Sequence, residues 1–128
     1  MRLLLDTQAA LYLWIAPERL GVSARVLLED PTNVLLFSQV STWEICLKYR
    51  IGKLPLPDTP EAYLRKRIRE SDLTYEPISD RALFDTVSLP DHHRDPFDRL
   101  LLATAKSLKI PIVSGDRNFQ KYPVDVIW

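Results

Sequence analysis

Short apolar segments alternate along the chain with segments of helical periodicity. The fully apolar runs MRLLL (residues 1–5) and VLLF (residues 34–37) are typical of buried β-strands. Shorter strand candidates lie at residues 74–76, 111–113 and 124–127 and are bounded by prolines or polar residues. We therefore predict five short strands.

Helical segments fill the intervals between these strands. We predict helices over residues 8–15, 24–29, 40–50, 60–71, 79–85, 96–108 and 116–122. Thr7 and Ser23 stand where they can cap the first two helices. The clearest apolar face belongs to the helix at 96–108, which places six residues on one side: Phe97, Leu100, Leu101, Thr104, Ala105 and Leu108. Strands that alternate with helices indicate an α/β fold with a parallel sheet covered on both faces.

Composition agrees with a single globular domain over residues 1–128. Hydrophobic residues make up 46% and charged residues 27% of the 128, and 17 basic residues balance 17 acidic ones. The sole cysteine, Cys46, excludes an internal disulfide and a cysteine-rich zinc site, and we expect it to be buried. No apolar run approaches the length of a membrane span, and residues 1–20 lack signal-peptide features, so we expect a cytoplasmic protein.

Four carboxylates stand where predicted strands pass into helices. Asp6 directly follows the first strand, and Asp116 follows the strand at 111–113 across a Ser-Gly turn. Glu44 lies one turn into the helix after VLLF, and Asp98 lies in the first turn of the helix at 96–108. Because ligands of parallel sheets bind at the carboxyl ends of the strands, we expect these side chains to converge.

Helix capping offers a structural explanation for each acid taken alone. Glu44 fits a capping box with Ser41, and Asp95 fits an N-cap, with Asp98 closing a box three residues later. The acids after the first and fourth strands likewise occupy turn or N-cap positions. Capping does not, however, require four acids to meet at one end of one sheet. The combination therefore favours a ligand site over four separate caps.

Carboxylates gathered without a cation would repel one another. At about 6 Å and an effective dielectric near 20, each pair of negative charges costs roughly 3 kcal/mol. Oxygen ligands of this kind suit Mg²⁺ or Mn²⁺. Carboxylate clusters that hold such ions hydrolyse phosphodiester bonds by activating water and stabilising the leaving oxygen. The pattern thus indicates metal-dependent phosphodiester hydrolysis.

Four fragments of the chain, in order and in spacing, carry a family resemblance: LLLDT, STWEI, HRDPFDRLLLATA and IVSGDRNF. Together they resemble the PIN-domain ribonucleases, and more narrowly the VapC-type toxins of toxin–antitoxin pairs. The resemblance implies a three-layer α/β/α sandwich and a Mg²⁺- or Mn²⁺-dependent endoribonuclease that leaves a 5′-phosphate and a 3′-hydroxyl. It also implies a homodimer and inhibition by a cognate antitoxin protein.

The resemblance assigns roles by position. The catalytic, metal-binding acids fall on Asp6, Glu44, Asp98 and Asp116. Asp95 belongs to the same DPFDR signature and is expected to support the site. Ser114 stands where relatives often have threonine, and its hydroxyl can bond a carboxylate. Arg99 directly follows the third acid and is expected to orient it or to meet a phosphate. Asn118 replaces an acid found in many relatives, which weakens any second metal site.

Other polar and aromatic residues leave two interpretations open. Lys48, Arg65, Lys66 and Arg69 are candidates for RNA contact, but a solvated helix face explains them equally well. Aromatic residues on the first and third helices can stack on bases, or pack in the core or a dimer; a hydrophobic antitoxin segment is expected near Trp14 or Trp43. His92 and His93 are the only histidines and have no second pair at metal-ligand spacing, so we expect a surface-loop role for both, with contact to substrate near the site as the alternative.

Two functions of other classes compete with the nuclease. A receiver-like Mg²⁺-binding switch also gathers acids at strand ends, but receivers have paired acids after the first strand and a late lysine, and here Asp6 is followed by Thr7. An RNA- or partner-binding PIN-like module without activity is the other alternative. The complete set of carboxylates speaks against it.

Overall fold

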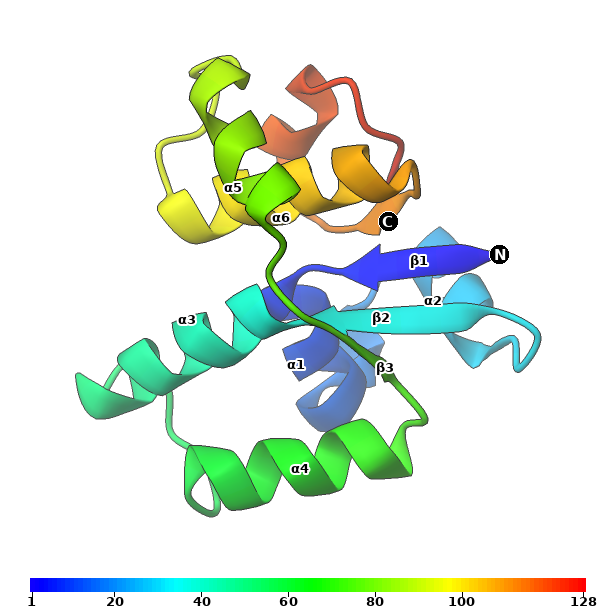
Figure 1. Cartoon of the computed structure of the whole chain (residues 1–128). Helices are drawn as coiled ribbons and strands as arrows, with labels where there is room; N and C mark the ends of the chain where they lie inside the picture. The colour runs from blue at the N-terminus through cyan, green and yellow to red at the C-terminus, as the bar shows by residue number, and fades with distance from the viewer.

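A parallel sheet of five strands forms the centre of the computed structural model, which describes residues 1–128 (Figure 1). The strands are β1 (Arg2–Leu5), β2 (Val34–Ser38), β3 (Thr74–Glu76), β4 (Ile112–Val113) and β5 (Val126–Ile127). Their order in the sheet is β3-β2-β1-β4-β5, and every neighbouring pair is parallel. In the central register Leu5 pairs with Phe37 on one side and with Val113 on the other. All five predicted strands are present.

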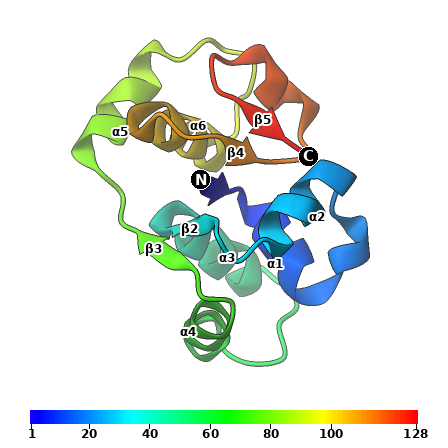
Figure 2. The same cartoon turned by 90° about the vertical axis from the view of Figure 1, so that its right-hand side faces the viewer.

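Helices cover both faces of the sheet. The α-helices are α1 (Thr7–Ile15), α2 (Val22–Glu29), α3 (Gln39–Arg50), α4 (Pro60–Glu70), α5 (Asp80–Asp85) and α6 (Pro96–Leu108). The chain also forms three short 3-10 helices, η1 (Pro17–Arg19), η2 (Thr86–Ser88) and η3 (Arg117–Lys121). Helices α1, α2 and α4 lie on one side of the strands and α5 and α6 on the other (Figures 1 and 2). The predicted α/β/α sandwich with a parallel central sheet is confirmed.

The apolar strands bury side chains on both faces. Leu3 and Leu5 of β1 belong to the core under α1, α2 and α4, whereas Leu4 belongs to the core under α5 and α6. All three are fully buried, which explains why the run reads as uniformly apolar rather than alternating. Helix α3 leaves the sheet at the carboxyl end of β2 and contributes to both cores, through Val40 to one and Ile45 to the other. None of the helices combines the length and apolar character of a membrane span.

Several predicted caps are wrong in detail. The N-cap of α1 is Asp6 rather than Thr7, because the Asp6 side chain accepts the Ala9 N–H. Helix α2 begins one residue before Ser23, at Val22, and has no side-chain cap.

The two predicted capping boxes do not form. Ser41 lies inside α3, whose N-cap is Ser38, so Glu44 is not a box partner. Asp95 caps α6 as predicted, but its own N–H donates to His93 and not to Asp98. Both Glu44 and Asp98 are therefore free of a capping role. The expectation that Cys46 is buried is also wrong, because its side chain is exposed on α3.

Candidate metal centre

One cavity of about 350 Å³ at the carboxyl ends of the strands is lined by all four predicted acids. Its lining residues are Asp6, Thr7, Gln8, Leu11, Glu44, Lys48, Lys53, Leu54, Asp95, Asp98 and Asp116. The acids arrive from four places in the chain: the end of β1, helix α3, the first turn of α6 and the loop after β4. Parallel topology brings these places to one edge of the sheet, as expected.

Asp6 is fixed by its position between β1 and α1. Its N–H donates to the Val113 carbonyl (3.0 Å), which ties it to β4, and its carboxylate accepts the Ala9 N–H (2.6 Å). Only 5% of Asp6 is exposed, and this burial raises its pKa to about 6, with smaller contributions from the charges of Glu44 and Asp116. Burial outweighs the effect of the Ser114 side chain and of the Ala9 N–H, which favour the charged form of this carboxylate.

Glu44 is only 4% exposed, and two side chains hold its carboxylate. The Thr7 hydroxyl donates to Oε1 (2.6 Å) and lies 2.8 Å from the Ser41 hydroxyl. Lys48, one turn further along α3, forms an ion pair with Oε2. Partial burial alone would lower the pKa of Lys48, but the hydrogen bond and charge of Glu44 outweigh it and raise that pKa. Glu44 is thus the one acid of the cluster with a lysine partner.

Asp98 and Asp116 meet at the ring of His93. The Nε2 atom of His93 lies 3.0 Å from Oδ2 of Asp98 and 2.8 Å from Oδ2 of Asp116. Burial, followed by the charge of Asp95, raises the pKa of Asp98 to about 7. Asp116 also caps η3 by accepting the Asn118 N–H (2.9 Å) on Oδ1. The Asp116 side chain therefore caps η3 and at the same time belongs to the acid cluster.

His93 is the site residue that the sequence analysis missed. The expected surface-loop role holds for His92, whose side chain is exposed, but is wrong for His93, whose side chain is only 14% exposed. Its ring packs edge-on against Phe119, with ring centroids 5.8 Å apart. The available signal was its position in HRDPFD, five residues before Asp98 and two residues before Asp95, the N-cap of α6. Counting histidines for a zinc site obscured that signal.

Arg99 supports the site through a loop and does not touch Asp98 or face the cavity. Its guanidinium donates to the carbonyls of Thr86 (2.8 Å), Leu89 (3.0 Å) and Pro90 (2.8 Å). A longer hydrogen bond reaches the His93 carbonyl (3.3 Å). The structure therefore gives Arg99 a role that differs from the expected one, which was to orient Asp98 or to meet a phosphate. It fastens the segment that carries His93 to helix α6.

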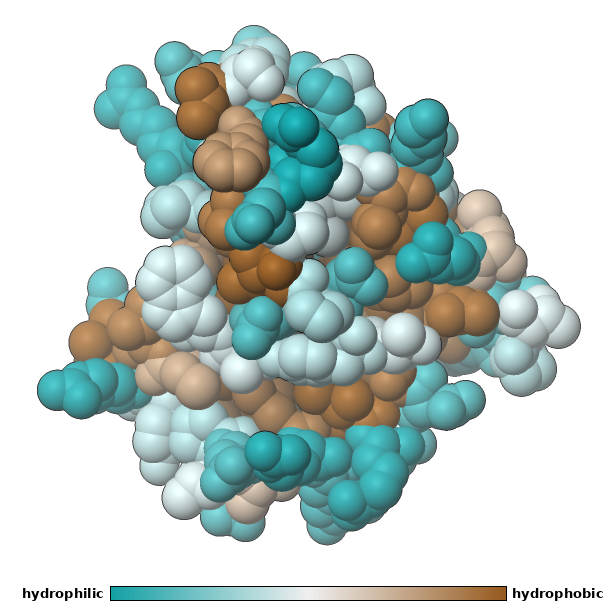
Figure 3. Space-filling model, in the orientation of Figure 1, coloured by the Kyte–Doolittle hydropathy of each residue, from teal (hydrophilic) through white to brown (hydrophobic).

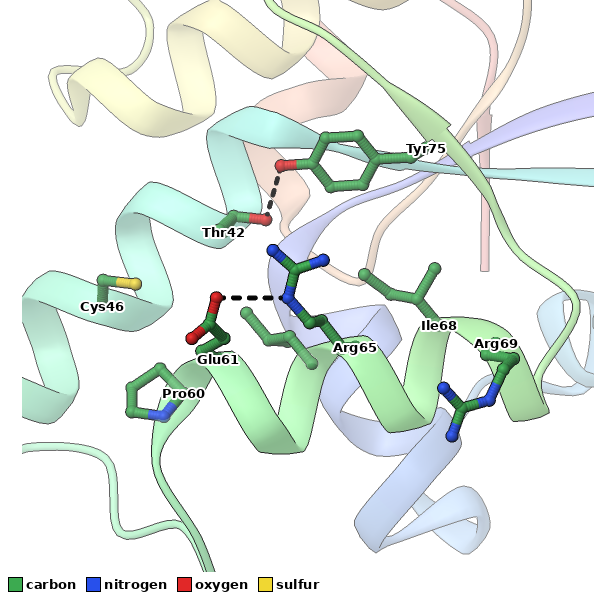
Figure 4. Close-up of a pocket in the computed structure, with 9 residues that line it drawn as sticks. Thr42, Cys46, Pro60, Glu61, Arg65, Ile68, Arg69 and Tyr75 are labelled. Atoms are coloured by element: carbon green, nitrogen blue, oxygen red, sulfur yellow. Dashed lines mark hydrogen bonds and ion pairs between the residues drawn. The ribbon is translucent and has the colours of Figure 1, made fainter.

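The predicted basic surface divides between two places. Lys48 lines the acidic cavity, whereas Arg65 and Arg69 line a larger cavity of about 600 Å³ between α3 and α4 (Figure 4). Arg65 pairs there with Glu61 (3.2 Å), and Lys66 is exposed on the same helix. Hydrophilic side chains cover the outer face of α4, with apolar ones in the strip between α4 and β3 (Figure 3). The larger cavity contains no part of the acid cluster.

The two tryptophans considered for contact with a base or a partner differ in their exposure. Trp14 is buried against Phe37 and Tyr63, so it is a core residue and offers no surface to a base or a partner. Trp43 is 52% exposed on α3 and contacts Phe97 of α6 at a centroid distance of 4.9 Å. Of the two tryptophans considered for partner contact, Trp43 is the accessible one.

Comparison with known proteins gives a family and several structural neighbours. The PIN domain family model matches residues 3–125. Ribonuclease VapC16 from Mycobacterium tuberculosis (strain ATCC 25618 / H37Rv) is 42% identical over 45 residues, which are 35% of this chain and 32% of that protein. The match therefore spans about a third of the length of that relative.

Solved structures share the fold at low sequence identity. VapBC2 from Rickettsia felis, bound to a DNA fragment from its promoter, superposes with a TM-score of 0.70 and 18% identity, covering 98% of this chain and 97% of the other. FitAcB from Neisseria gonorrhoeae gives a TM-score of 0.60 and 21% identity, covering 97% and 95%. With the acid cluster at the carboxyl edge of a five-stranded parallel sheet and a family match over nearly the whole chain, this protein belongs to the PIN domain family.

Proposed function

We propose that this chain is a metal-dependent endoribonuclease and acts as the toxin of a toxin–antitoxin pair. The observation that carries the proposal is the convergence of four carboxylates, two of them buried, on one small cavity, where the pKa values of Asp6 and Asp98 are raised to about 6 and about 7. The name of the relative, a ribonuclease, supports the same activity.

The donor set fits a hard divalent cation. Every candidate ligand atom from the four acids is a carboxylate oxygen, and Lys48 is the only basic side chain paired with any of the four, apart from His93. Asp6, Glu44, Asp98 and Asp116 would hold Mg²⁺ or Mn²⁺. When bound, such an ion lowers the pKa of a coordinated water and neutralises charge on a phosphodiester.

The remaining residues of the cavity organise the acids and receive the substrate. Thr7 and Lys48 fix the Glu44 carboxylate, and the Ala9 N–H fixes that of Asp6. Lys48 and Lys53 are the cationic side chains at the cavity and are placed to attract the phosphates of RNA. Arg65, Lys66 and Arg69 lie on α4, where they would contact a longer RNA outside the cavity.

We further propose a homodimer that is inhibited by a cognate antitoxin in the cytoplasm, where its RNA substrate is found. Large apolar side chains are exposed on α3 and on the segment from α5 to η2. They include Trp43, Leu47, Leu83, Phe84 and Val87. Exposed apolar residues of this density on a small domain favour association with other chains. Trp43 is the proposed point of antitoxin contact, because Trp14 is buried.

Cleavage of purified cellular RNA tests the activity most simply. Wild-type protein should yield discrete fragments in Mg²⁺ or Mn²⁺ and none in EDTA. Asp98→Asn should reduce the cleavage rate by more than about 100-fold, since it removes a charged ligand while leaving the helix cap at Asp95 intact. Glu61→Gln, on the other cavity, is the matched control and should cleave normally. Metal-independent cleavage, or full activity of the Asp98 variant, would contradict the proposal; no cleavage by protein that binds metal would favour the binding module.

A further inference from the structure

His93 bridges two of the four acids, and its ring can do so in either of two ways. Nε2 forms a hydrogen bond with Oδ2 of Asp116 (2.8 Å) and lies 3.0 Å from Oδ2 of Asp98. The imidazole can be a metal ligand through Nε2, or a donor whose Nε2–H bonds the carboxylates. These two roles require opposite tautomers, because a ligating nitrogen carries no proton.

Metal-ligating histidines have a recognisable second hydrogen bond. The ring nitrogen that does not bind the metal carries the proton and donates it to a carboxylate, a carbonyl or water. A ligand role for Nε2 of His93 would therefore place an acceptor beside Nδ1.

The structure places a donor there instead. The backbone N–H of Asp95 donates to Nδ1 of His93 (3.1 Å). Nδ1 consequently offers its lone pair, and the ring proton must be on Nε2, which faces the two carboxylates.

The surroundings leave the ring little freedom to flip. The His93 N–H donates to the Tyr122 hydroxyl (2.8 Å), and the His93 carbonyl accepts from Arg99 (3.3 Å). The ring lies against Phe119, and Asp95 is itself fixed as the N-cap of α6. Backbone and ring are therefore both held in the orientation that points Nε2–H into the cluster.

We propose that His93 is a positioning residue of the metal centre: as the Nε2–H tautomer it clamps Asp116 beside Asp98 by a hydrogen bond and does not ligate the metal. The proposal rests on the metal-dependent function proposed above. The clamp engages Oδ2 of Asp116, and Oδ2 of Asp98 lies 3.0 Å from the same nitrogen. Oδ1 of Asp98 makes no hydrogen bond within the chain and is left for a cation, whereas Oδ1 of Asp116 caps η3. His93 thus orients oxygen ligands and leaves the ligand set purely carboxylate.

Two substitutions test the hydrogen-bond donor of the His93 ring separately from its acceptor. In His93→Asn the amide oxygen can still accept the Asp95 N–H, but nothing reaches the carboxylates. In His93→Gln the longer amide can still donate to the carboxylates. Titration calorimetry with Mn²⁺ should show a 10- to 100-fold weaker Kd for the Asn variant, the usual cost of losing an outer-shell partner, and a Kd within about threefold of wild type for the Gln variant. Equal affinities in all three proteins, or equal losses in both variants, would overturn the clamp.

A second measurement uses the native ring and does not depend on how the variants fold. His92→Gln leaves His93 as the only histidine, so its two ¹⁵N ring signals are unambiguous. We expect Nε2 protonated and Nδ1 unprotonated, before and after addition of Mg²⁺, and no directly coordinated ¹⁴N in the pulsed electron paramagnetic resonance spectrum of bound Mn²⁺. Protonated Nδ1, or a directly coordinated nitrogen, would overturn the proposal. Failure of the wild-type protein to bind either ion would instead refute the proposed function, and the tautomer would still decide the role of His93.

Discussion

Two cavities flank helix α3, and the smaller one carries the chemistry. The cavity between α3 and α4 has a volume of about 600 Å³ and contains one acid, Glu61, paired with Arg65. The cavity at the carboxyl edge of the sheet has about 350 Å³ and contains five acids. Volume alone would indicate the larger cavity as the ligand site, but the charges that line the two cavities indicate the smaller one. Buried like charges need a compensating partner, and an exposed ion pair does not.

The two cavities also contain the same local motif in different surroundings. Glu44–Lys48 and Glu61–Arg65 are both ion pairs between residues four apart on a helix. The Glu61 and Arg65 side chains are each about three-quarters exposed, whereas the Glu44 side chain is 5% exposed. Identical spacing therefore produces a weak surface pair in one cavity and a fixed, partly desolvated carboxylate in the other.

The largest difference between the cavities should appear in the pH dependence of stability without metal. Asp6 has a folded pKa of about 6, above the ordinary value of 3.8. A raised carboxyl pKa means that the folded state binds the proton more tightly, so this stabilisation is complete below about pH 4 and is lost as the pH rises through 6. The loss for Asp6 approaches about 3 kcal/mol in total.

Urea unfolding in EDTA at pH 5 and at pH 8 measures this effect. The free energy of unfolding of wild type should fall between the two values by more than that of Asp6→Asn, whose amide oxygen still accepts the Ala9 N–H. Above pH 7 the Asn variant should be the more stable protein. Parallel pH profiles of the two proteins, or a less stable variant at pH 8, would show that the charge of Asp6 does not destabilise the folded state. Glu61→Gln should leave the wild-type profile unchanged.

A smaller difference should separate the two ion pairs. Lys48→Met leaves Glu44 buried with Thr7 as its remaining side-chain partner, and should destabilise the metal-free protein by about 1–2 kcal/mol at pH 8, discounted because 46% of the Lys48 side chain is exposed. Arg65→Met should cost less than about 0.5 kcal/mol. Chemical denaturation of the two variants measures both values. Equal costs would mean that burial of Glu44 does not distinguish the pairs.

Much of the fold follows from the sequence because its strands are uniformly apolar and its helices are amphipathic. The runs containing Leu3 and Leu36 are buried on both faces, which is a local signal of a parallel sheet. Convergence of the acids also follows, since parallel topology alone brings strand ends together.

The errors arise where tertiary contacts decide between locally equal choices. Asp6 and Thr7 are both good N-caps, and the backbone bond from Asp6 to Val113 settles which residue ends the strand. His93 enters the site because the loop before α6 folds back and is fastened by Arg99. Cys46 is apolar enough for a core, but its face of α3 opens onto the α4 cavity. None of these outcomes leaves a periodic trace in the sequence.

The smallest expected effect is at Cys46, in the larger cavity. Cys46→Ser should change the free energy of unfolding by less than about 0.5 kcal/mol, because the side chain is exposed. In the native wild-type protein a thiol reagent should label Cys46 without denaturant. A thiol that reacts only after unfolding would mean that this face of α3 is covered in solution.

The central claim is that the carboxylates gathered at the smaller cavity require a divalent cation. Thermal unfolding at pH 8, in EDTA and in Mn²⁺ at about 100 times its Kd, tests it most directly. Saturation at that level contributes about 2.7 kcal/mol, which should raise the Tm of wild type by roughly 10 °C and leave that of Asp6→Asn much less changed. An equal Tm with and without the ion in the wild-type protein would contradict the account.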